Sequence, residues 1–343
     1  MQIKNKQLAP RTAFTMVELV IVIAIIAILM AFLLPAIGGA ITSARNATVV
    51  SEISNLEKAI GEFKLKFGVE PPSRIYLYEQ EAGWDRTDLI TRESKAFIRQ
   101  CWPNFDFDYT DQSGELDING NDAIESTDDG RIFLNGAECL LFFLGGMCAT
   151  EDSTGAALRD ASGSTPPSGT AGTIEKWFPL GFSTNPSSPF VRGGTRVGPF
   201  YEFNSDRIGD INGGTLLRAM PEYIDPLPGQ TSPYLYASSH GGRGYNFDAT
   251  ASSAGDIYNV DLALGVSSPA PMEMIYIQSA ASTERSTSAT PFNKNSYQII
   301  SPGLDNQYGT GGAYDKDDGF TGFDDQVQKD NITNFSGGVL DPS

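Results

Sequence analysis

A long apolar run opens the hydrophobic pattern of this chain. From Leu19 to Ile37 no side chain is charged or polar. Nineteen residues of helix at about 1.5 Å per residue extend roughly 28 Å, and a bilayer core is about 30 Å thick. The run therefore predicts that residues 14–37 form a membrane-spanning helix, with Pro35 inside it.

Beyond residue 37 the pattern becomes periodic. Over residues 38–68 the apolar positions are spaced three and four apart, which predicts one apolar stripe on an amphipathic helix. Charged residues, Glu52 among them, lie off this stripe, and Gly68 with Pro71-Pro72 ends the helix. We expect this helix to pack on a globular head through the stripe. The stripe consists of Val49, Ile53, Leu56, Ile60, Phe63 and Phe67.

Residues 69–343 have the composition of a head with long insertions. Ser94–Trp102 and Gly136–Leu144 are predicted helices, the second one buried. An acidic loop is expected at 106–129 and a flexible loop of small residues at 150–172. The predicted fold class is α+β, with the long N-terminal helix packed on an antiparallel sheet. The β-prone runs, separated by Gly and Pro turns, are Pro199–Phe203, Pro233–Tyr236, Met274–Ile277 and Tyr297–Ile300.

The charge distribution excludes a nucleic-acid partner. The formal net charge is −18, and residues 1–13 carry three bases and no acid, so the remaining chain has a net charge of −21. Such a surface repels phosphate backbones and suits a head that binds divalent cations. The three cysteines, Cys101, Cys139 and Cys148, are too few for a disulfide scaffold. A Cys139–Cys148 disulfide and three buried thiols are both compatible with the sequence.

Catalytic motifs are lacking in the sequence. His240 is the single histidine, and there is no Gly-x-Ser-x-Gly elbow to supply a nucleophile for it. The run Gly241–Gly244 is too short for a phosphate-binding loop. We therefore expect a protein that is not an enzyme.

The acidic loop contains one candidate metal site. Counting from Asp117, oxygen-bearing side chains fall at loop positions 1, 3, 5, 9 and 12, which is the ligand spacing of an EF-hand calcium loop. The pattern departs at position 6, where Asp122 replaces the usual glycine. A solvated acidic loop explains the same residues without a metal. The candidate ligands are Asp117, Asn119, Asn121, Glu125 and Asp128.

The N-terminus carries a joint motif. A basic leader ends in the small residue Ala13, Phe14 follows it, and Glu18 stands four residues later at the mouth of the apolar run. Placing a carboxylate inside a membrane costs about 2.5–3.5 kcal/mol of free energy, so Glu18 needs a partner. These residues, with Pro35 at position 22 counted from Phe14, resemble the start of type IV pilins and of the pseudopilins of type II secretion systems. The family usually has Gly where this chain has Ala13.

This resemblance implies a processing and assembly route. A prepilin peptidase would cut between Ala13 and Phe14, Phe14 would be methylated, and the helix would polymerise. Glu18 would pair with the new N-terminal amine of a neighbouring subunit, or alternatively with Phe14 of its own chain. A secretory signal peptide cut after Ala40 and an uncut signal anchor are the alternatives for the same apolar run.

The tail also resembles part of this family. The strand Tyr297–Ile300 is followed by the turn Gly303-Leu304-Asp305 and, after a long acidic loop, by Asp330-Asn331-Ile332. In major pseudopilins a similar tail folds around calcium. The resemblance implies a calcium loop over 303–335, with the side chains of Asp305 and Asp330 and the carbonyls of Leu304 and Ile332 as ligands. Many type IV pilins close this tail with a disulfide instead, which favours a pseudopilin.

Together these features predict a structural subunit that polymerises into a periplasmic pseudopilus for type II secretion. Its expected partners are copies of itself, the prepilin peptidase and the inner-membrane platform of the secretion system. It would cross the inner membrane once and hold its head in the periplasm. The alternatives are a type IV pilus subunit at the cell surface, for adhesion or motility, and a membrane-anchored calcium- or carbohydrate-binding protein that does not polymerise.

Overall fold

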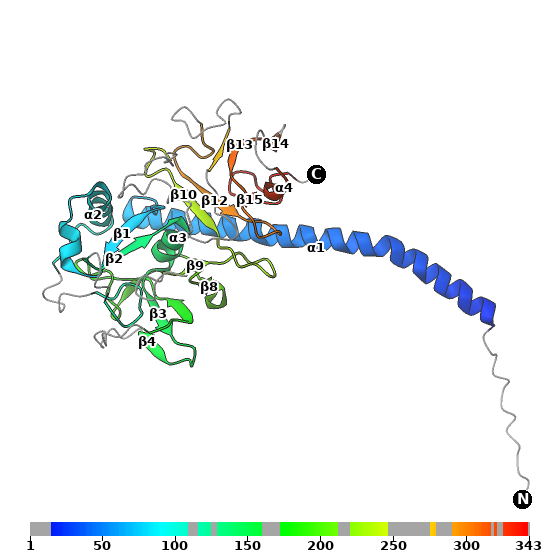
Figure 1. The fold of residues 1–343 in the computed structure, drawn as a ribbon, viewed down its shortest axis with the longest axis horizontal. Coiled ribbons are helices and arrows are strands. Elements are labelled where there is room, and N and C mark those ends of the chain that lie inside the picture. The colour runs from blue at the N-terminus through cyan, green and yellow to red at the C-terminus, as the bar shows by residue number, and fades with distance from the viewer. Residues whose placement is uncertain are drawn as a thin grey trace, which may run out of the picture. The chain divides into compact units, whose positions relative to one another are not determined.

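The computed structural model describes residues 15–108, 116–124, 129–159, 172–211, 220–245, 275–278, 290–316, 319–320 and 325–341. The chain divides into two compact units, Met1–Arg45 and Asn46–Ser343, the second of which is the head. The helices are α1 (Met16–Phe67), α2 (Leu89–Cys101), α3 (Gly136–Gly145) and α4 (Asp325–Gln328), with short 3-10 helices η1 (Glu81–Asp85) and η4 (Ser205–Arg207) (Figure 1).

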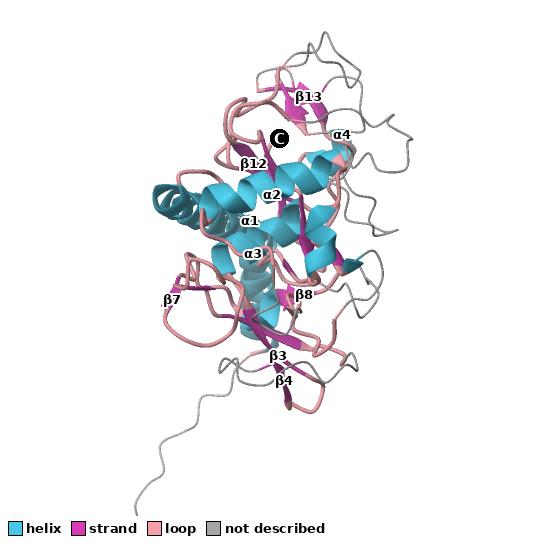
Figure 2. Cartoon of the chain, turned by 90° about the vertical axis from the view of Figure 1, so that its left-hand side faces the viewer, coloured by secondary structure: helices cyan, strands magenta, loops and turns pink. Residues whose placement is uncertain are grey.

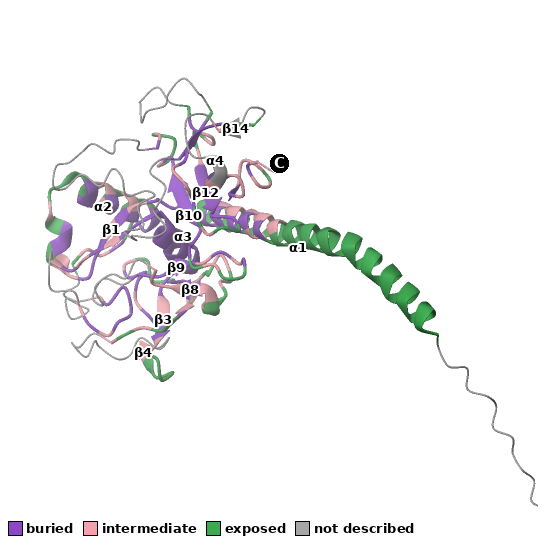
Figure 3. Cartoon of the chain, turned by 45° about the vertical axis from the view of Figure 1, so that its right-hand side comes forward, coloured by how far each residue is buried: buried purple, intermediate pink, exposed green. Residues whose placement is uncertain are grey.

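Helix α1 is continuous from Met16 to Phe67 and passes through Pro35 without a break. The sequence predicts that the helix continues past Pro35, and the structure confirms that the apolar and amphipathic segments form one helix. Every residue from 15 to 45 is exposed when the chain is taken alone, as the green part of α1 in Figure 3 shows. An apolar surface of this length is stable only against lipid or other apolar helices.

The predicted apolar stripe attaches α1 to the head. Its residues between Val49 and Phe63 are at most 2% exposed, and Phe67 is half-buried. The ring of Phe67 packs 4.6 Å from Phe63 and 5.0 Å from Trp102, measured between centroids. Burying one phenylalanine side chain contributes about 1.5–3 kcal/mol, so the stripe is a main source of head stability.

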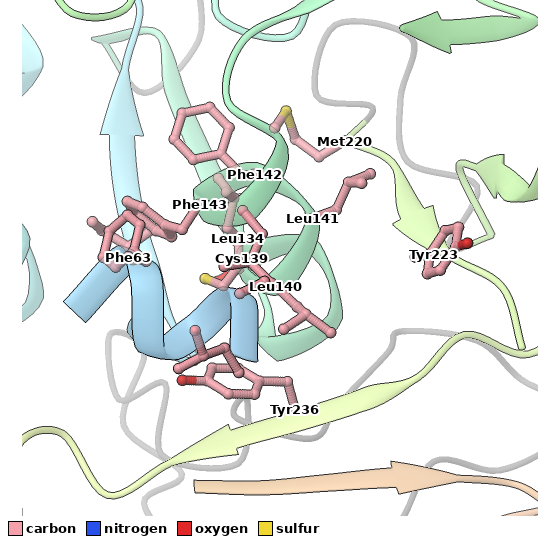
Figure 4. Close-up of a cluster of buried hydrophobic side chains, with 14 of the residues drawn as sticks. Phe63, Leu134, Cys139, Leu140, Leu141, Phe142, Phe143, Met220, Tyr223 and Tyr236 are labelled. Atoms are coloured by element: carbon pink, nitrogen blue, oxygen red, sulfur yellow. The ribbon is translucent and has the colours of Figure 1, made fainter. Parts of the chain in front are cut away.

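Helix α3 is the centre of the head core, and all ten of its residues are buried. Asn135 accepts a hydrogen bond from the Glu138 backbone N–H, and Glu138 accepts one from Asn135, which forms a capping box at the helix start. The predicted helix Gly136–Leu144 is confirmed and is one residue longer. Figure 4 shows α3 side chains packed around Phe63 of α1 and Tyr236.

Helix α2 begins earlier than the sequence predicted. The expected helix Ser94–Trp102 is observed as Leu89–Cys101. Asp88 caps it, because its Oδ1 accepts a hydrogen bond from the Thr91 N–H at 2.9 Å. The run of polar residues from Thr91 to Lys95 interrupts the hydrophobic pattern, so the pattern alone does not place the start of the helix at Leu89.

The strands of the described residues form six small sheets, and every ladder except β11–β13 is antiparallel. The three-stranded sheets have the orders β10-β12-β15, β11-β13-β14 and β4-β3-β5, and β1-β2, β6-β7 and β8-β9 are pairs. In Figures 1 and 2, β12 and β13 lie on one side of the head helices, and β3 and β4 lie on the other. The strands are β1 (Ile75–Tyr78), β2 (Arg131–Leu134), β3 (Cys148–Glu151), β4 (Ala157–Arg159), β5 (Lys176–Pro179), β6 (Phe182–Ser183), β7 (Arg196–Val197), β8 (Ile208–Gly209), β9 (Glu222–Tyr223), β10 (Leu235–Ser238), β11 (Tyr276–Ile277), β12 (Tyr297–Ser301), β13 (Gly312–Asp315), β14 (Gly319–Phe320) and β15 (Ile332–Thr333).

The α+β fold with a long N-terminal helix and antiparallel pairing is confirmed, but the single expected sheet is replaced by several small ones. Strands near three of the four predicted positions are β10, β11 and β12. Pro199–Phe203 was wrongly predicted as a strand. Its Phe200 ring packs instead on α1, 5.5 Å from the ring of Phe63. The aromatic residues of this segment therefore pack against α1, and the segment does not pair with a neighbouring strand.

The start of the loop predicted at 150–172 is a hairpin of β3 and β4. Its turn is fixed by Asp152, whose Oδ1 accepts hydrogen bonds from the backbone N–H groups of Thr154 (2.8 Å) and Ala156 (3.0 Å). The small and polar residues of this segment predict a flexible loop, but the structure shows that they form a closed turn. Residues 160–171 lie outside the described part of the chain.

All three cysteines are free thiols, so the Cys139–Cys148 disulfide is wrong and the alternative without a bond is observed. Cys101 and Cys139 are buried, and Cys148 is half-buried. The thiol of Cys139 donates to the Leu134 carbonyl at 3.7 Å, and that of Cys148 to the Gly146 carbonyl at 3.9 Å. Each thiol therefore faces its own local backbone.

Candidate functional site

The N-terminal end of α1 holds Glu18 in a capping arrangement. One carboxylate oxygen, Oε2, accepts hydrogen bonds from the backbone N–H of Thr15 at 2.8 Å and from its hydroxyl at 2.9 Å. In return the Thr15 hydroxyl accepts a hydrogen bond from the Glu18 N–H at 3.2 Å. This reciprocal pair is a Thr-x-x-Glu capping box, and its sequence signal is Thr15 three residues before Glu18. Ala13 and Phe14 lie outside the described residues.

The apolar part of α1 has the properties of a membrane anchor. Within the described residues, α1 is the one helix that is long and apolar enough to cross a membrane. Pro35 lies inside it. The side chains around it, such as Leu33 and Leu34, are 56% and 66% exposed. This surface is available to lipid and to other helices of the same kind.

A polar network joins α1 to the head at Glu52. Its two carboxylate oxygens each accept a hydrogen bond of 2.8 Å from the guanidinium group of Arg207. The hydroxyls of Tyr201 and Tyr223 donate to Oε1 at 3.0 Å, and that of Tyr234 donates to Oε2 at 2.7 Å. Arg207 also lies over the Tyr223 ring, 4.3 Å from its centroid. Four side chains from distant parts of the sequence thus meet Glu52 at one helical position.

The electrostatics of this network favour the charged form of Glu52. Burial by itself would raise the pKa of Glu52, but the hydrogen bonds and positive charge of Arg207 and the tyrosine hydroxyls outweigh it and lower the pKa. The partly buried Arg207 has a raised pKa, because its bonds to Glu52 outweigh burial. Glu52 lies beyond the apolar run Leu19–Ile37 and in the head unit. The network therefore anchors the head and does not belong to the membrane-spanning part.

The turn after β12 brings the two predicted calcium-ligating aspartates together. Oδ2 of Asp330 accepts hydrogen bonds from the backbone N–H groups of Leu304 at 2.5 Å and Asp305 at 3.0 Å. Gly303, with φ of 68°, permits this approach, because a Cβ there would lie 2.5 Å from the Asp330 carboxyl carbon. Ile332, the fourth predicted ligand, lies in β15 opposite Ser301.

The side-chain donors of this turn are oxygen atoms, the kind of ligand that a divalent cation prefers. Oδ1 of Asp330 is buried and has no hydrogen-bond partner among the described residues. Burial raises the pKa of Asp330, and burial followed by the charge of Asp330 raises the pKa of Asp305 to about 6. Lys329 does not neutralise these two carboxylates, because its ammonium group pairs with Asp341 at 3.4 Å. Among the described residues no cationic side chain pairs with Asp305 or Asp330, and hard oxygen donors of this kind are the ligands that calcium takes.

The calcium loop predicted over 303–335 contains further aspartates. Asp317, Asp318 and Asp324 of the loop over 303–335 lie outside the described residues. Within the described residues, no group of three or more His, Cys, Asp or Glu side chains is arranged to hold a metal. The two aspartates would therefore need carbonyl or water oxygens to complete a calcium shell.

In the second candidate metal site, the carboxylate of Asp117 already has partners within the protein. Oδ1 of Asp117 accepts a hydrogen bond from the Gly120 N–H at 2.7 Å, and Oδ2 accepts one from the Asp122 N–H at 3.2 Å. The guanidinium group of Arg159 lies 3.1 Å from the same Oδ2. A cation in this loop would face the positive charge of Arg159, which disfavours binding.

The two asparagines of this loop also have backbone partners. The side-chain oxygen of Asn119 accepts a hydrogen bond from the Asn121 N–H at 3.1 Å, and that of Asn121 accepts one from the Ala123 N–H at 2.9 Å. Glu125 and Asp128 lie outside the described residues. The EF-hand-like site stays a prediction, and the geometry favours the tail turn over it.

Two buried glutamates, Glu138 and Glu222, are close enough to each other and to Asp210 to interact electrostatically. Oε2 of Glu222 accepts a hydrogen bond from the Ile211 N–H at 3.0 Å. Burial, followed by the charge of Glu138, raises the pKa of Glu222, and burial likewise raises that of Glu138. The head thus keeps these carboxyls protonated at pH values where the unfolded chain ionises them. Their contribution to stability is fully present below the unfolded pKa of about 4.5 and is lost as pH rises through the folded pKa values.

We expect Glu222→Gln to stabilise the head at pH 8 by about 1–2 kcal/mol and to have little effect near pH 4. The amide keeps an oxygen acceptor for the Ile211 N–H and carries no charge to bury. Urea unfolding at the two pH values measures the difference, with the exposed Glu202→Gln as the matched control. A gain of equal size at both pH values would show that the charge of Glu222 is not its cause.

The comparison with known families gives one match. Residues 9–34 match the prokaryotic N-terminal methylation motif, the leader and first helical turns of type IV pilin-like prepilins. No curated protein and no solved structure matches the chain. The motif implies processing by a prepilin peptidase and assembly into pilin-type polymers, and with helix α1 it fits a single-pass membrane anchor. It supports a type IV pilin-like subunit and does not distinguish a pseudopilus from a pilus.

Proposed function

We propose that this chain is a subunit of a type II secretion pseudopilus. The methylation motif at residues 9–34, which is followed by a continuous helix with an exposed apolar half, supports a pilin-like subunit. The tail turn that joins Asp305 to Asp330 favours a pseudopilin within that class. Once the leader is removed, this helix anchors the subunit in the inner membrane and later packs against the helices of neighbouring subunits. The head, on the periplasmic side, is fixed to the same helix through the buried stripe and Glu52. Its partners are further copies of the chain, the prepilin peptidase and the inner-membrane platform.

The first prediction concerns the leader. We expect cleavage between Ala13 and Phe14, because a basic leader and a small residue precede Phe14, and Glu18 follows it at the motif spacing. Mass spectrometry of the protein extracted from membranes should find a peptide that begins at Phe14 with one added methyl group. A mature chain that begins at Ile41 would instead identify an ordinary signal peptide and would refute the proposal.

Deleting the gene distinguishes a pseudopilus from a pilus. A pseudopilin mutant should accumulate secretion substrates in the periplasm and keep its surface fibres and surface motility. A mutant that loses fibres or motility while it secretes normally would identify a type IV pilus subunit. A mutant that keeps both would favour a membrane-anchored protein that does not polymerise.

We also propose that the tail turn binds calcium through Asp305 and Asp330. The unpartnered Oδ1 of Asp330 and the raised pKa values of both carboxyls support this. Calcium supplies positive charge to these oxygens, and the backbone N–H groups of Leu304 and Asp305 hold the Asp330 carboxylate in position. A bound ion would stabilise the fold of the tail against β12 and β15.

We therefore expect the full-length chain in detergent to melt at a higher temperature in calcium than in chelator. At a hundredfold excess over the Kd, the stabilisation is about 2.7 kcal/mol. Asp330→Asn should remove most of the calcium effect, whereas the remote and exposed Asp85→Asn should keep it. A melting temperature indifferent to calcium would exclude the tail site, and a response lost only in Asp117→Asn would move the site to the other loop.

A further inference from the structure

A groove of about 560 Å³ lies in the head beside α2. One wall is a single face of that helix, and the other walls come from the segment after α1 and from the turn after β10. Its volume is within the range of ligand sites, about 300–1,000 Å³. The helical wall consists of Leu89, Arg92, Glu93, Ala96, Phe97 and Gln100.

The acidic residues of the groove already have cationic partners. Glu70 pairs with Lys64 at 3.0 Å, and Glu93 pairs with Arg74 at 3.5 Å. Their negative charge is therefore compensated within the head. These two glutamates are the carboxylates among the groove's lining residues.

The two arginines of the groove are differently placed. Arg92 is exposed, and its guanidinium group has no carboxylate within ion-pair distance among the described residues. Arg243 is also exposed, and its Nε donates a hydrogen bond to the His240 carbonyl at 3.0 Å, which is not a charge partner. The groove thus presents two uncompensated positive charges on a chain whose net charge is −18.

The walls of the groove suit a peptide better than a sugar. Leu89 is 46% exposed, so the helical wall offers aliphatic surface to an apolar side chain. Phe97 is the one Phe, Tyr or Trp residue of the lining, and its ring already packs edge-on against Phe143, 5.3 Å away, instead of lying open as a stacking platform. The turn after β10 adds exposed backbone at Gly241, where φ is 74°.

We propose that this groove binds an extended, acidic peptide segment of a partner protein. From Leu89 to Gln100 the helical wall extends about 17 Å, which matches roughly five residues of extended chain. Carboxylate side chains of the peptide pair with Arg92 and Arg243, and an apolar side chain packs between them on Leu89. None of the residues that line the groove belongs to the unit Met1–Arg45, so the proposal does not depend on whether the chain forms a fibre.

A peptide array tests the proposal with the full-length chain in detergent. The array holds hexapeptides in which each position is acidic, neutral or basic, beside fragments of polygalacturonate as an acidic sugar. We expect binding of acidic peptides above neutral ones, and a loss of about tenfold for each arginine changed in Arg92→Gln and Arg243→Gln. The double variant Arg45→Gln with Lys176→Gln removes the same net charge outside the groove and should bind like the wild type.

Three results would overturn the proposal. The first is equal binding of acidic and neutral peptides. The second is acidic binding that is unchanged in the Arg92→Gln/Arg243→Gln variant or equally reduced in the Arg45→Gln/Lys176→Gln control, which would indicate nonspecific charge attraction. The third is binding of polygalacturonate in place of peptides at the same arginines. Near-ultraviolet circular dichroism of each variant verifies that the head remains folded.

Discussion

Replacing Glu52 by alanine is expected to lower the free energy of unfolding of the head by about 3 kcal/mol. The change removes the carboxylate that accepts two hydrogen bonds from Arg207, whose side chain is 21% exposed. It also leaves the hydroxyls of Tyr201, Tyr223 and Tyr234 without their acceptor. A partly buried guanidinium without its counter-charge costs more than a lost surface ion pair, because water solvates it incompletely.

Urea unfolding of the full-length chain in detergent measures this effect. Trp84, Trp102 and Trp177 are all buried in the head, so tryptophan fluorescence reports on the head alone. The matched control is Glu62→Ala, an exposed glutamate on the same helix, which should change stability by no more than about 0.5 kcal/mol. Equal effects of the two substitutions would refute the anchoring role of Glu52.

A double-mutant cycle with Arg207→Ala isolates the pair. We expect a coupling energy of about 1–3 kcal/mol between Glu52 and Arg207, because they share two hydrogen bonds. The pKa of Glu52 is lowered in the head, so its stabilisation is present above the ordinary glutamate value of 4.5 and is lost as pH falls through the folded pKa. The stability difference between wild type and Glu52→Gln should therefore shrink at acidic pH.

The sequence predicts α1 well because its signals are local. Unbroken apolar residues define the segment from Leu19 to Ile37, and the spacing of three and four identifies the buried stripe. Glu52 was assigned to the exposed side by the same reasoning, although it stands three residues after Val49 and four before Leu56, at the edge of the stripe. Its partners come from Tyr201, Arg207 and later residues, and helical periodicity carries no information about such distant contacts.

The sites of the head show the same division between local and long-range information. The prediction that Asp305 and Asp330 lie together rests on a family resemblance and on a glycine that is visible in the sequence. The structure brings the two residues together. In contrast, spacing alone suggested a calcium loop at Asp117, and it could not reveal that Arg159 occupies the space beside that carboxylate. The strand predicted at Pro199–Phe203 is wrong, because Phe200 packs on Phe63 of α1, a distant contact that local β-propensity does not reveal.

Replacing Glu18 by alanine is expected to abolish fibres while the protein stays folded in the membrane. Leader removal creates an ammonium group at Phe14, and within a membrane an unpaired charge costs about 2.5–3.5 kcal/mol. If Glu18 of one subunit pairs with the amine of its neighbour, losing the pair weakens each subunit addition by about a hundredfold. Electron microscopy of sheared fibres, with immunoblots of the membrane fraction, measures assembly and retention separately.

The control for this prediction separates the capping role of Glu18 from its charge. Glu18 accepts two hydrogen bonds from Thr15 through Oε2, so a loss of fibres in Glu18→Ala has two explanations, a lost cap or a lost charge. Glu18→Gln keeps a side chain that caps a helix but removes the charge, whereas Thr15→Val removes the hydroxyl and keeps the charge. We expect Glu18→Gln to lose fibres and Thr15→Val to form them. The opposite outcome would mean that Glu18 acts by capping α1, and that its pairing with a neighbouring amine is not required for assembly.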